Sequence, residues 1–314
     1  MSELLFGLNT ILPIFLLILT GVFLKKIGLI TEDFISMGTS LVYYCALPVR
    51  MFQDVSGSDF HNMTNVKFIS FIMLATLAGF LGIWLLAVKL CPDRSKRGAF
   101  IHSAFRGNYV YVGIPITQNI LQMAMVPCTV LVITFVVPLY NILGVVVLSW
   151  YSQEGHKINM KKLLLDILKN PLILAVLLGL PFSFFGWRLP GAVHEALSDL
   201  GAISMPLALL FIGASIRFGE FVREFWLSMK AAIVKVVLQP LLFVPLAIFL
   251  GFNAQEVVTI YVMLSVPTAL NAYIVTKKLG GDEDTAAGIV VATLLLCIVT
   301  VPVGIVLLKG AGII

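Results

Sequence analysis

Polar side chains interrupt an otherwise apolar sequence at two places, and each place contains a proline. The first holds Asn108, Tyr111, Gly113, Pro115 and Asn119, and the second holds Ser265, Pro267, Thr268 and Asn271. Amides and hydroxyls exchange hydrogen bonds with a solute without carrying a charge. Each proline is followed four residues later by an asparagine, about one helical turn away. These residues are predicted to bind a small solute, although the amides could instead serve only to satisfy opened backbone groups.

The two prolines also predict where the backbone opens. Proline lacks an N–H and clashes with the preceding helical turn, so we expect Pro115 and Pro267 each to split a helix near its middle. The second half of a split helix begins with its N-terminus, which carries about half a positive charge. Two such ends facing one cavity favour an anion. Arg50 and Arg106 could attract that anion, or they could extend to the lipid headgroups, as is expected of Lys235.

Motifs for covalent chemistry are missing from the sequence. It contains no phosphate-binding glycine loop, no His-Glu-x-x-His and no close cysteine pair. We therefore expect neither an enzyme nor an ATP-driven pump, and we predict no cofactor or metal. Proton-coupled carriers commonly keep an acid deep in the membrane, whereas Asp54, Glu195 and Glu256 are expected at the outer ends of helices. A sodium site made of carbonyls and amides is also conceivable, so the choice among proton, sodium and membrane potential stays open.

The composition places these residues in a membrane. Hydrophobic residues make up 60% of the 314 residues, charged residues make up 12%, and the mean hydropathy is +1.03, whereas soluble domains carry about 25% charged residues. A hydrocarbon core of about 30 Å requires roughly 20 helical residues. Ten apolar segments approach or exceed that length: 8–24, 34–52, 68–90, 99–122, 127–149, 170–186, 202–218, 229–250, 255–278 and 285–308. They are apolar all round, which predicts helices and excludes a β-barrel.

Basic residues are distributed unevenly among the connections between these segments. One side of the membrane receives Lys25, Lys26, Lys89, Arg94, Lys96, Arg97, Lys157, Lys161, Lys162, Lys169, Arg217, Arg223, Lys230, Lys277 and Lys278, and the other receives Lys67, Arg188 and Lys309. The positive-inside rule assigns the basic side to the cytoplasm. We therefore predict a multi-pass protein of the cell membrane with both termini outside. The net charge of +5 is attributed to contact with membrane lipid, and no nucleic-acid partner is expected.

The two halves of the sequence repeat one pattern of glycine and proline. Gly21, Gly28 and Pro48 match Gly179, Gly186 and Pro206 at a spacing of 158, and Pro115 matches Pro267 at a spacing of 152. Because five segments form each half, the second half must enter the membrane from the opposite face. The prediction is an all-α polytopic membrane protein with ten transmembrane helices in two inverted repeats, at 1–150 and 170–314. A cytoplasmic link at 151–169 joins them, and helices four and nine are broken.

Residues 105–116 read Phe-Arg-Gly-Asn-Tyr-Val-Tyr-Val-Gly-Ile-Pro-Ile. This run resembles the N-x-x-x-x-G-I-P signature of the auxin efflux carrier family, which includes bacterial carboxylate transporters and the plant PIN carriers. The Ala46-Leu47-Pro48 end of the second segment and Pro267 in the ninth also fit, and the likeness covers essentially the whole chain. The short link at 150–169 is similar to that of bacterial members.

The resemblance implies an inverted-repeat fold with crossing broken helices, a scaffold domain, and a crossover domain that moves like an elevator. It implies small organic anions as substrates, such as malonate, malate or auxin-like acids. By matching position, Asn108, Gly113 and Pro115 would belong to the crossover site and Pro267 to its partner. Elevator-type relatives are often homodimers.

The predicted function is secondary active or potential-driven transport of a small organic anion, a mono- or dicarboxylate, by alternating access. A multi-span receptor or sensor that binds a small molecule without net transport is the alternative. A receptor has no reason to open two helices at corresponding positions, and the sequence shows no cytosolic signalling segment.

Overall fold

The computed structural model describes residues 2–57, 65–123, 126–151, 165, 168–215 and 218–314. In the first half the elements are α1 (Ser2–Lys26), α2 (Glu32–Leu41), η1 (Val42–Ala46), α3 (Leu47–Ser56), α4 (Val66–Leu90), α5 (Arg94–Phe105), η2 (Tyr109–Gly113), α6 (Ile114–Leu121), α7 (Pro127–Leu131), η3 (Val132–Val136) and α8 (Val137–Tyr151). The second half holds α10 (Pro171–Phe185), α11 (Gly191–Ala202), α12 (Ser204–Ser215), α13 (Phe218–Ile233), η4 (Val234–Leu238), α14 (Gln239–Phe249), α15 (Ala254–Ser265), α16 (Asn271–Lys278) and α17 (Glu283–Gly310). The label η marks π-helical turns. The link predicted at 151–169 lies largely outside the described residues.

Long apolar helices dominate the described part of the chain. Five continuous helical runs are long and apolar enough to cross a membrane: Val66–Leu90, Pro127–Tyr151, Gly191–Ser215, Glu224–Phe249 and Glu283–Gly310. The described residues form no strand beyond one isolated bridge. The all-helical, polytopic character predicted from the sequence is therefore confirmed. The predicted start of the seventh segment at 202 is wrong, since the helix begins at Gly191 with a more polar first half.

Each of the four π-helical turns ends two residues before a proline, at Pro48, Pro115, Pro138 and Pro240. A π-turn is wider than an α-turn, so it can accommodate the proline ring and the missing N–H without ending the helix. The chain is consequently helical from Tyr109 to Leu121. The prediction that Pro115 splits the fourth helix is wrong, because the interruption lies before η2, at residues 106–108.

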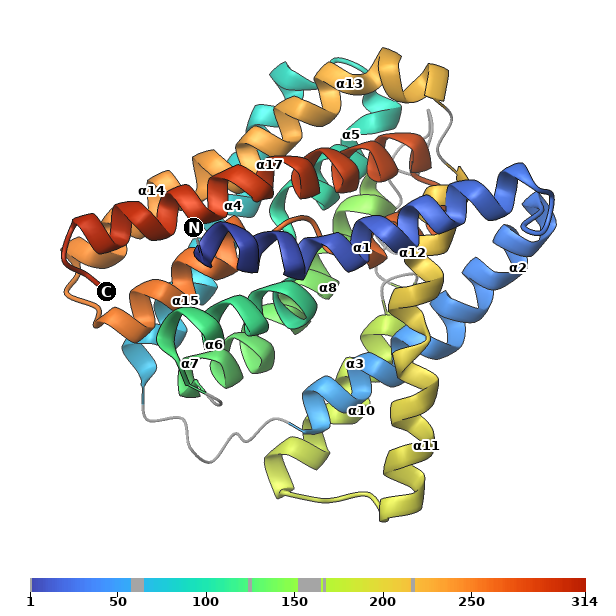
Figure 1. The fold of residues 1–314 in the computed structure, drawn as a ribbon. Helices are drawn as coiled ribbons and strands as arrows, with labels where there is room; N and C mark the ends of the chain where they lie inside the picture. Colours follow the sequence, from blue (N-terminus) through green and yellow to red (C-terminus); the bar gives the residue numbers. More distant parts are fainter. Residues whose placement is uncertain (1, 58–64, 124–125, 152–164, 166–167, 216–217) are drawn as a thin grey trace.

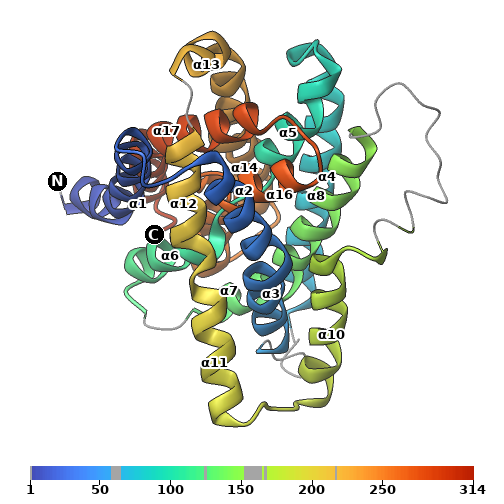
Figure 2. The same ribbon diagram turned by 90° about the vertical axis from the view of Figure 1, so that its right-hand side faces the viewer.

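The helices form two bodies (Figures 1 and 2). One, here named the panel body, contains α1, α2–η1–α3, α10, α11 and α12, in which α1 packs against α12 while α10 and α11 pack against α3. The other, here named the crossing body, contains α4–α8 and α13–α17. In Figure 1 most of the panel body lies to the right and below, with α1 passing in front of the crossing body. At the centre of the crossing body, α5 and α15 are buried on all sides over residues 98–105 and 256–265.

Candidate solute-binding site at the helix crossing

Two interrupted helices meet inside the crossing body. The helices α5 and α15 begin at the capping residues Asp93 and Asn253, whose side chains accept hydrogen bonds from backbone N–H groups of the first turn. The backbone and hydroxyl of Ser95 both donate to Asp93, and these bonds hold the pKa of that carboxyl below its usual range. Each helix then runs inward for 12 residues before the chain becomes extended. The two caps therefore fix where each helix enters the crossing.

The extended segments pair with each other in an antiparallel bridge between Gly107 and Thr268. The backbone N–H of Asn108 donates to the carbonyl of Pro267 at 2.8 Å, and that of Ala269 donates to the carbonyl of Arg106 at 3.4 Å. A Cβ on Gly107 would lie 2.9 Å from the Met263 carbonyl oxygen. Only glycine lets the two chains approach this closely. The break of the first helix thus depends on Gly107, and the break of the second on Pro267.

Side chains satisfy the backbone groups that the breaks leave without helical partners. At the end of α5, Thr268 Oγ1 donates to the Ser103 carbonyl (2.7 Å) and Gln239 Nε2 donates to the Ala104 carbonyl (3.1 Å). At the end of α15, Lys235 Nζ donates to the Leu264 carbonyl (2.8 Å) and Cys297 Sγ donates to the Ser265 carbonyl (3.2 Å). The backbone N–H of Thr268 donates to Thr293 Oγ1 (3.1 Å). An unpaired backbone group in hydrocarbon costs several kcal/mol. This set of bonds allows both breaks to lie deep in the protein.

Lys235 does not extend to the headgroups, so the expectation for this residue is wrong. Its side chain is fully buried, and its ammonium lies at the C-terminal end of α15, where the helix dipole is negative. Gln239 lies one turn further along the same helical run and caps α5 in the same way. The i, i+4 spacing of Lys235 and Gln239 in an apolar segment was the sequence signal for a shared polar face.

A cavity lies beside the crossing, between the two bodies. Its wall contains Leu47, Arg50, Met51 and Asp54 of α3, residues 204, 205 and 208 of α12, Val137 and Tyr140 of α8, residues 106, 107 and 109–111, and residues 269–271. The centre of a water molecule has about 60 Å³ of space there, enough for a few waters. The first residues of η2 and of α16 are both in the wall. The N-terminal ends of both second half-helices therefore border this space.

Two arginines reach the cavity from opposite bodies. Arg50 of the panel body pairs with Asp54, with 3.0 Å between Arg50 Nε and Asp54 Oδ1, and its guanidinium carbon lies 5.3 Å from the centre of the Tyr111 ring. Arg106 of the crossing body is 4% exposed. Arginine matches the planar geometry of a carboxylate. Two arginines and two helix N-terminal ends make the wall suited to an anion.

A family model described as Membrane transport protein matches residues 6–305. The chain belongs to this family. The match confirms the resemblance to the auxin efflux carrier family that residues 105–116 indicated. The chain is 23% identical over 297 residues to an uncharacterized transporter of Methanothermobacter thermautotrophicus, covering 94% of this chain and 96% of the relative. It is 24% identical over 304 residues to a protein of Rhizobium meliloti named "Putative malonate transporter", covering 93% and 92%.

The structure of this membrane transport protein brings some of the predicted site residues to the cavity and leaves others away from it. Arg50, Arg106, Tyr111 and Asn271 line it. The Asn271 Oδ1 atom and the nearby Asn108 Nδ2 atom are buried without a hydrogen-bond partner among the described residues. The Asn271 amide is therefore available to a solute in the cavity, whereas Asn108 is absent from the cavity wall.

Other predicted residues form the crossing itself. Ser265, Pro267 and Thr268 are buried where the two extended segments meet. Gly113 packs against the ring of Tyr109. Pro115 and Asn119 are exposed and are absent from the cavity wall. The matched spacing of the two Pro–Asn pairs therefore does not place the two asparagines in equivalent positions.

Among its described residues, the cavity wall contains one acid, Asp54, near the end of α3. Asp54 was expected at the outer end of its helix; it lies two residues before the C-terminal end of α3 and lines the cavity, with Arg50 one turn before it. The i, i+4 spacing of an arginine and an aspartate was the available signal. Among the described residues of this family member, no group of three or more His, Cys, Asp or Glu side chains is arranged to hold a metal ion.

Proposed function

We propose that this protein carries small carboxylates across the membrane by alternating access and binds them in the cavity at the crossing. The observation that carries the proposal is the convergence of Arg50, Arg106 and both second half-helix N-termini on one space between two bodies. The name of the Rhizobium meliloti relative is consistent with a malonate-like substrate. In this proposal the substrate contacts Arg50, Arg106, Tyr111 and Asn271, with Asn108 beside them. Gly113, Ser265, Pro267 and Thr268 have a supporting role.

The proposal includes ten spans in two inverted repeats, and the helix bounds support it. The bounds of α5 and α15 differ by 160 positions at both ends, and those of α2–η1–α3 and α11–α12 differ by 159 at both ends. Gly28 and Gly186, at the ends of α1 and α10, both have positive φ, at 79° and 67°. Equivalent elements at a nearly constant spacing are typical of an internal repeat.

Contacts between the two halves show the same nearly constant sequence spacing. A Cβ on Gly21 of α1 would lie 2.2 Å from the Leu210 carbonyl oxygen of α12, and a Cβ on Gly179 of α10 would lie 3.0 Å from the Phe52 carbonyl oxygen of α3. Both glycines and both of their partners are separated by 158 positions. The first helix of each half thus packs against the second span of the other half. This packing favours one panel body shared by both halves, against which the crossing body moves. With the basic connections inside, both termini lie outside.

Uptake of radiolabelled malonate by liposomes that contain the purified protein tests this proposal. We expect saturable uptake into the lumen that unlabelled malonate competes for and that protein-free liposomes lack. A receptor would instead bind malonate without moving it across the bilayer. Saturable binding with no luminal label, at several imposed membrane potentials and pH gradients, would therefore favour the receptor function and contradict the proposal.

A further inference from the structure

The cavity wall contains a carboxylate of its own, that of Asp54, and this carboxylate forms an ion pair with Arg50, which also lines the cavity. Arg50 and Asp54 are one turn apart on α3, and their side chains are 28% and 15% exposed. Given the proposed transport function, we propose that Asp54 couples transport to protons: a substrate carboxylate replaces Asp54 on Arg50, and Asp54 takes up a proton that crosses with the substrate.

The charges in the wall lead to this inference. Among the described residues that line the cavity, the side chains that carry a full charge at neutral pH are those of Arg50, Arg106 and Asp54. Two positive charges and one negative charge give the wall a net charge of +1. A monocarboxylate makes the occupied cavity neutral while Asp54 stays ionised. A dicarboxylate leaves one negative charge in excess unless Asp54 is protonated. An uncompensated charge enclosed by protein is strongly unfavourable, so a dianion and a proton are expected to bind together.

The elements packed against α3 supply no other described group that would take this role. The neighbouring helix α10 contributes Phe182 and Gly179, and α11 contributes His194, Glu195 and Asp199, whose side chains are exposed. The crossing body contributes Arg106 and the hydroxyls of Tyr111 and Tyr140. Lys235 lies behind the crossing on the Leu264 carbonyl and is not in the cavity wall.

The coupled step conserves charge and protons. On one side of the membrane, a proton from water binds a carboxylate oxygen of Asp54, the Arg50–Asp54 ion pair breaks, and Arg50 donates to a substrate carboxylate instead. On the other side the substrate leaves, Asp54 releases the proton to water, and the ion pair forms again. One dicarboxylate and one proton cross in each cycle, with a net transfer of one negative charge. A monocarboxylate crosses without a proton.

Liposomes with the membrane potential held at zero by potassium and valinomycin provide the test. The outside is set one pH unit more acidic than the lumen, with both values high enough that malonate is fully ionised. Wild-type protein is expected to accumulate malonate about tenfold, since one pH unit is a tenfold proton ratio. Malonamate, which keeps one carboxylate, is expected only to equilibrate. A dye in the lumen is expected to report one proton entering with each malonate.

The variant Asp54→Asn is expected to exchange labelled for unlabelled malonate but to give no accumulation from the pH gradient. Asp199→Asn, the same change at an exposed carboxylate, serves as the control and is expected to behave like wild type. Malonate transport by wild type without proton entry, or pH-driven accumulation that persists in Asp54→Asn, overturns the inference. So does an Asp54→Asn protein that elutes as a folded species but has lost exchange. No flux of any carboxylate by wild type would contradict the proposed function itself.

Discussion

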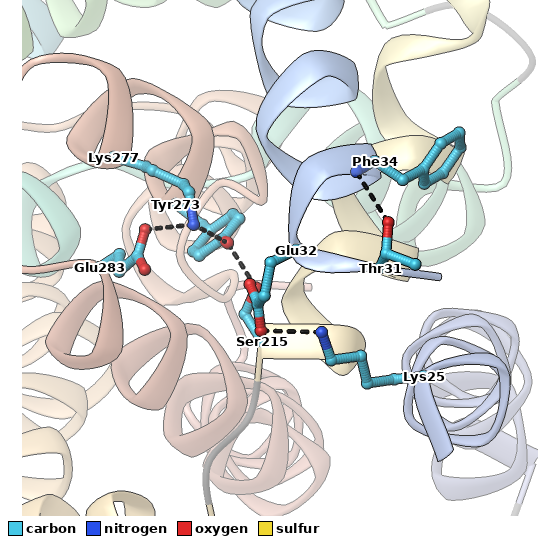
Figure 3. Close-up of polar contacts among 8 residues, drawn as sticks. All are labelled: Lys25, Thr31, Glu32, Phe34, Ser215, Tyr273, Lys277 and Glu283. Carbon is cyan, nitrogen blue, oxygen red and sulfur yellow. Dashed lines mark hydrogen bonds and ion pairs between the residues drawn. The ribbon is translucent and has the colours of Figure 1, made fainter. Parts of the chain in front are cut away.

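The second halves of the two broken helices, α6 and α16, lie in different surroundings although they follow equivalent breaks. The helix α16 is attached to the panel body: the hydroxyl of Tyr273 lies 2.6 Å from Ser215 Oγ of α12, and Lys278 donates to Ser40 of α2. Figure 3 shows Tyr273 between Ser215 and Lys277, which in turn pairs with Glu283. The helix α6 packs mainly against α15, makes a smaller contact with α1 of the panel body, and leaves Pro115 and Asn119 exposed.

This difference shows that the two halves of the molecule are not in the same conformation. Under the proposed topology α16 is on the cytoplasmic side, so we expect its contacts with Ser40 and Ser215 to close the path from the cavity to the cytoplasm. The hydrogen bonds of Tyr273 to Ser215 and of Lys278 to Ser40 join α16 to the panel body, and such bonds can be exchanged for bonds to water when the bodies separate. Release of substrate to the cytoplasm then requires α16 to leave α2 and α12.

Fixing α16 to the panel body is expected to have the largest effect. In the double variant Ser40→Cys and Lys278→Cys, a bifunctional thiol reagent should join α2 to α16 and reduce malonate uptake to background, because the cytoplasmic side can no longer open. Cleavage of a reducible reagent should restore uptake. Each single cysteine variant, treated with the same reagent, controls for the four native cysteines. Full uptake in a quantitatively cross-linked protein would show that α16 does not need to move.

Variants of Asn119 in α6 and Asn271 in α16 test whether the two helices differ in their contact with the substrate. Asn271→Ala is expected to weaken malonate transport roughly ten- to a hundredfold, since the loss of a hydrogen bond to a charged group costs about 1.5–3 kcal/mol. Asn119→Ala is the matched control at an exposed position and should leave uptake unchanged. The measurement is the concentration dependence of malonate uptake. Equal losses in both variants would show that the exposed face of α6 also handles substrate.

The hydrogen bonds that Lys235 and Gln239 donate to backbone carbonyls at the two breaks are expected to differ in strength. Lys235→Met leaves the Leu264 carbonyl unsatisfied and should lower the free energy of unfolding by about 1–3 kcal/mol. Gln239→Leu also leaves a carbonyl unsatisfied, that of Ala104, but it removes a neutral donor in place of a charged one and should cost less, about 1 kcal/mol. Thermal unfolding of the purified variants tests the order, with the exposed Lys230→Met as the control. If Gln239→Leu is less stable than Lys235→Met, the predicted order of the two hydrogen bonds is wrong.

Removing one hydroxyl should weaken the attachment of α16 only slightly. Tyr273→Phe loses the hydrogen bond to Ser215, worth about 1 kcal/mol, so the population open to the cytoplasm should rise roughly fivefold. The readout is the rate at which a membrane-impermeant maleimide labels a cysteine at position 40 from the cytoplasmic side. Tyr44→Phe, at an exposed ring, controls for the loss of a tyrosine. An unchanged labelling rate would show that the hydroxyl of Tyr273 does not help to hold α16 against the panel body.

Apolar composition alone was sufficient to locate most helices, because lipid requires long runs without charge. The start of the seventh segment was missed because residues 191–202 include His194, Glu195 and Asp199, which interrupt the apolar run. Proline was a misleading signal at Pro115, since a π-helical turn absorbs it. The break at Gly107 was not predicted, because the need for glycine there arises from the Met263 carbonyl of a helix far away in the sequence.

Part of the candidate site followed from residue type, and the rest required the fold. Arg50, Arg106, Tyr111 and Asn271 were named because polar side chains are rare in the apolar segments of this sequence. The burial of Lys235 and the position of Asp54 in the cavity wall depend on which helices pack against them. No local pattern fixes those neighbours.

A structure of the protein determined with malonate tests the central claim most directly. The account predicts malonate in the cavity between the two bodies, with one carboxylate on the Arg50 guanidinium and hydrogen bonds to the side chain of Asn271. Malonate bound elsewhere, or a cavity that stays closed to it at a concentration that saturates uptake, would contradict the account.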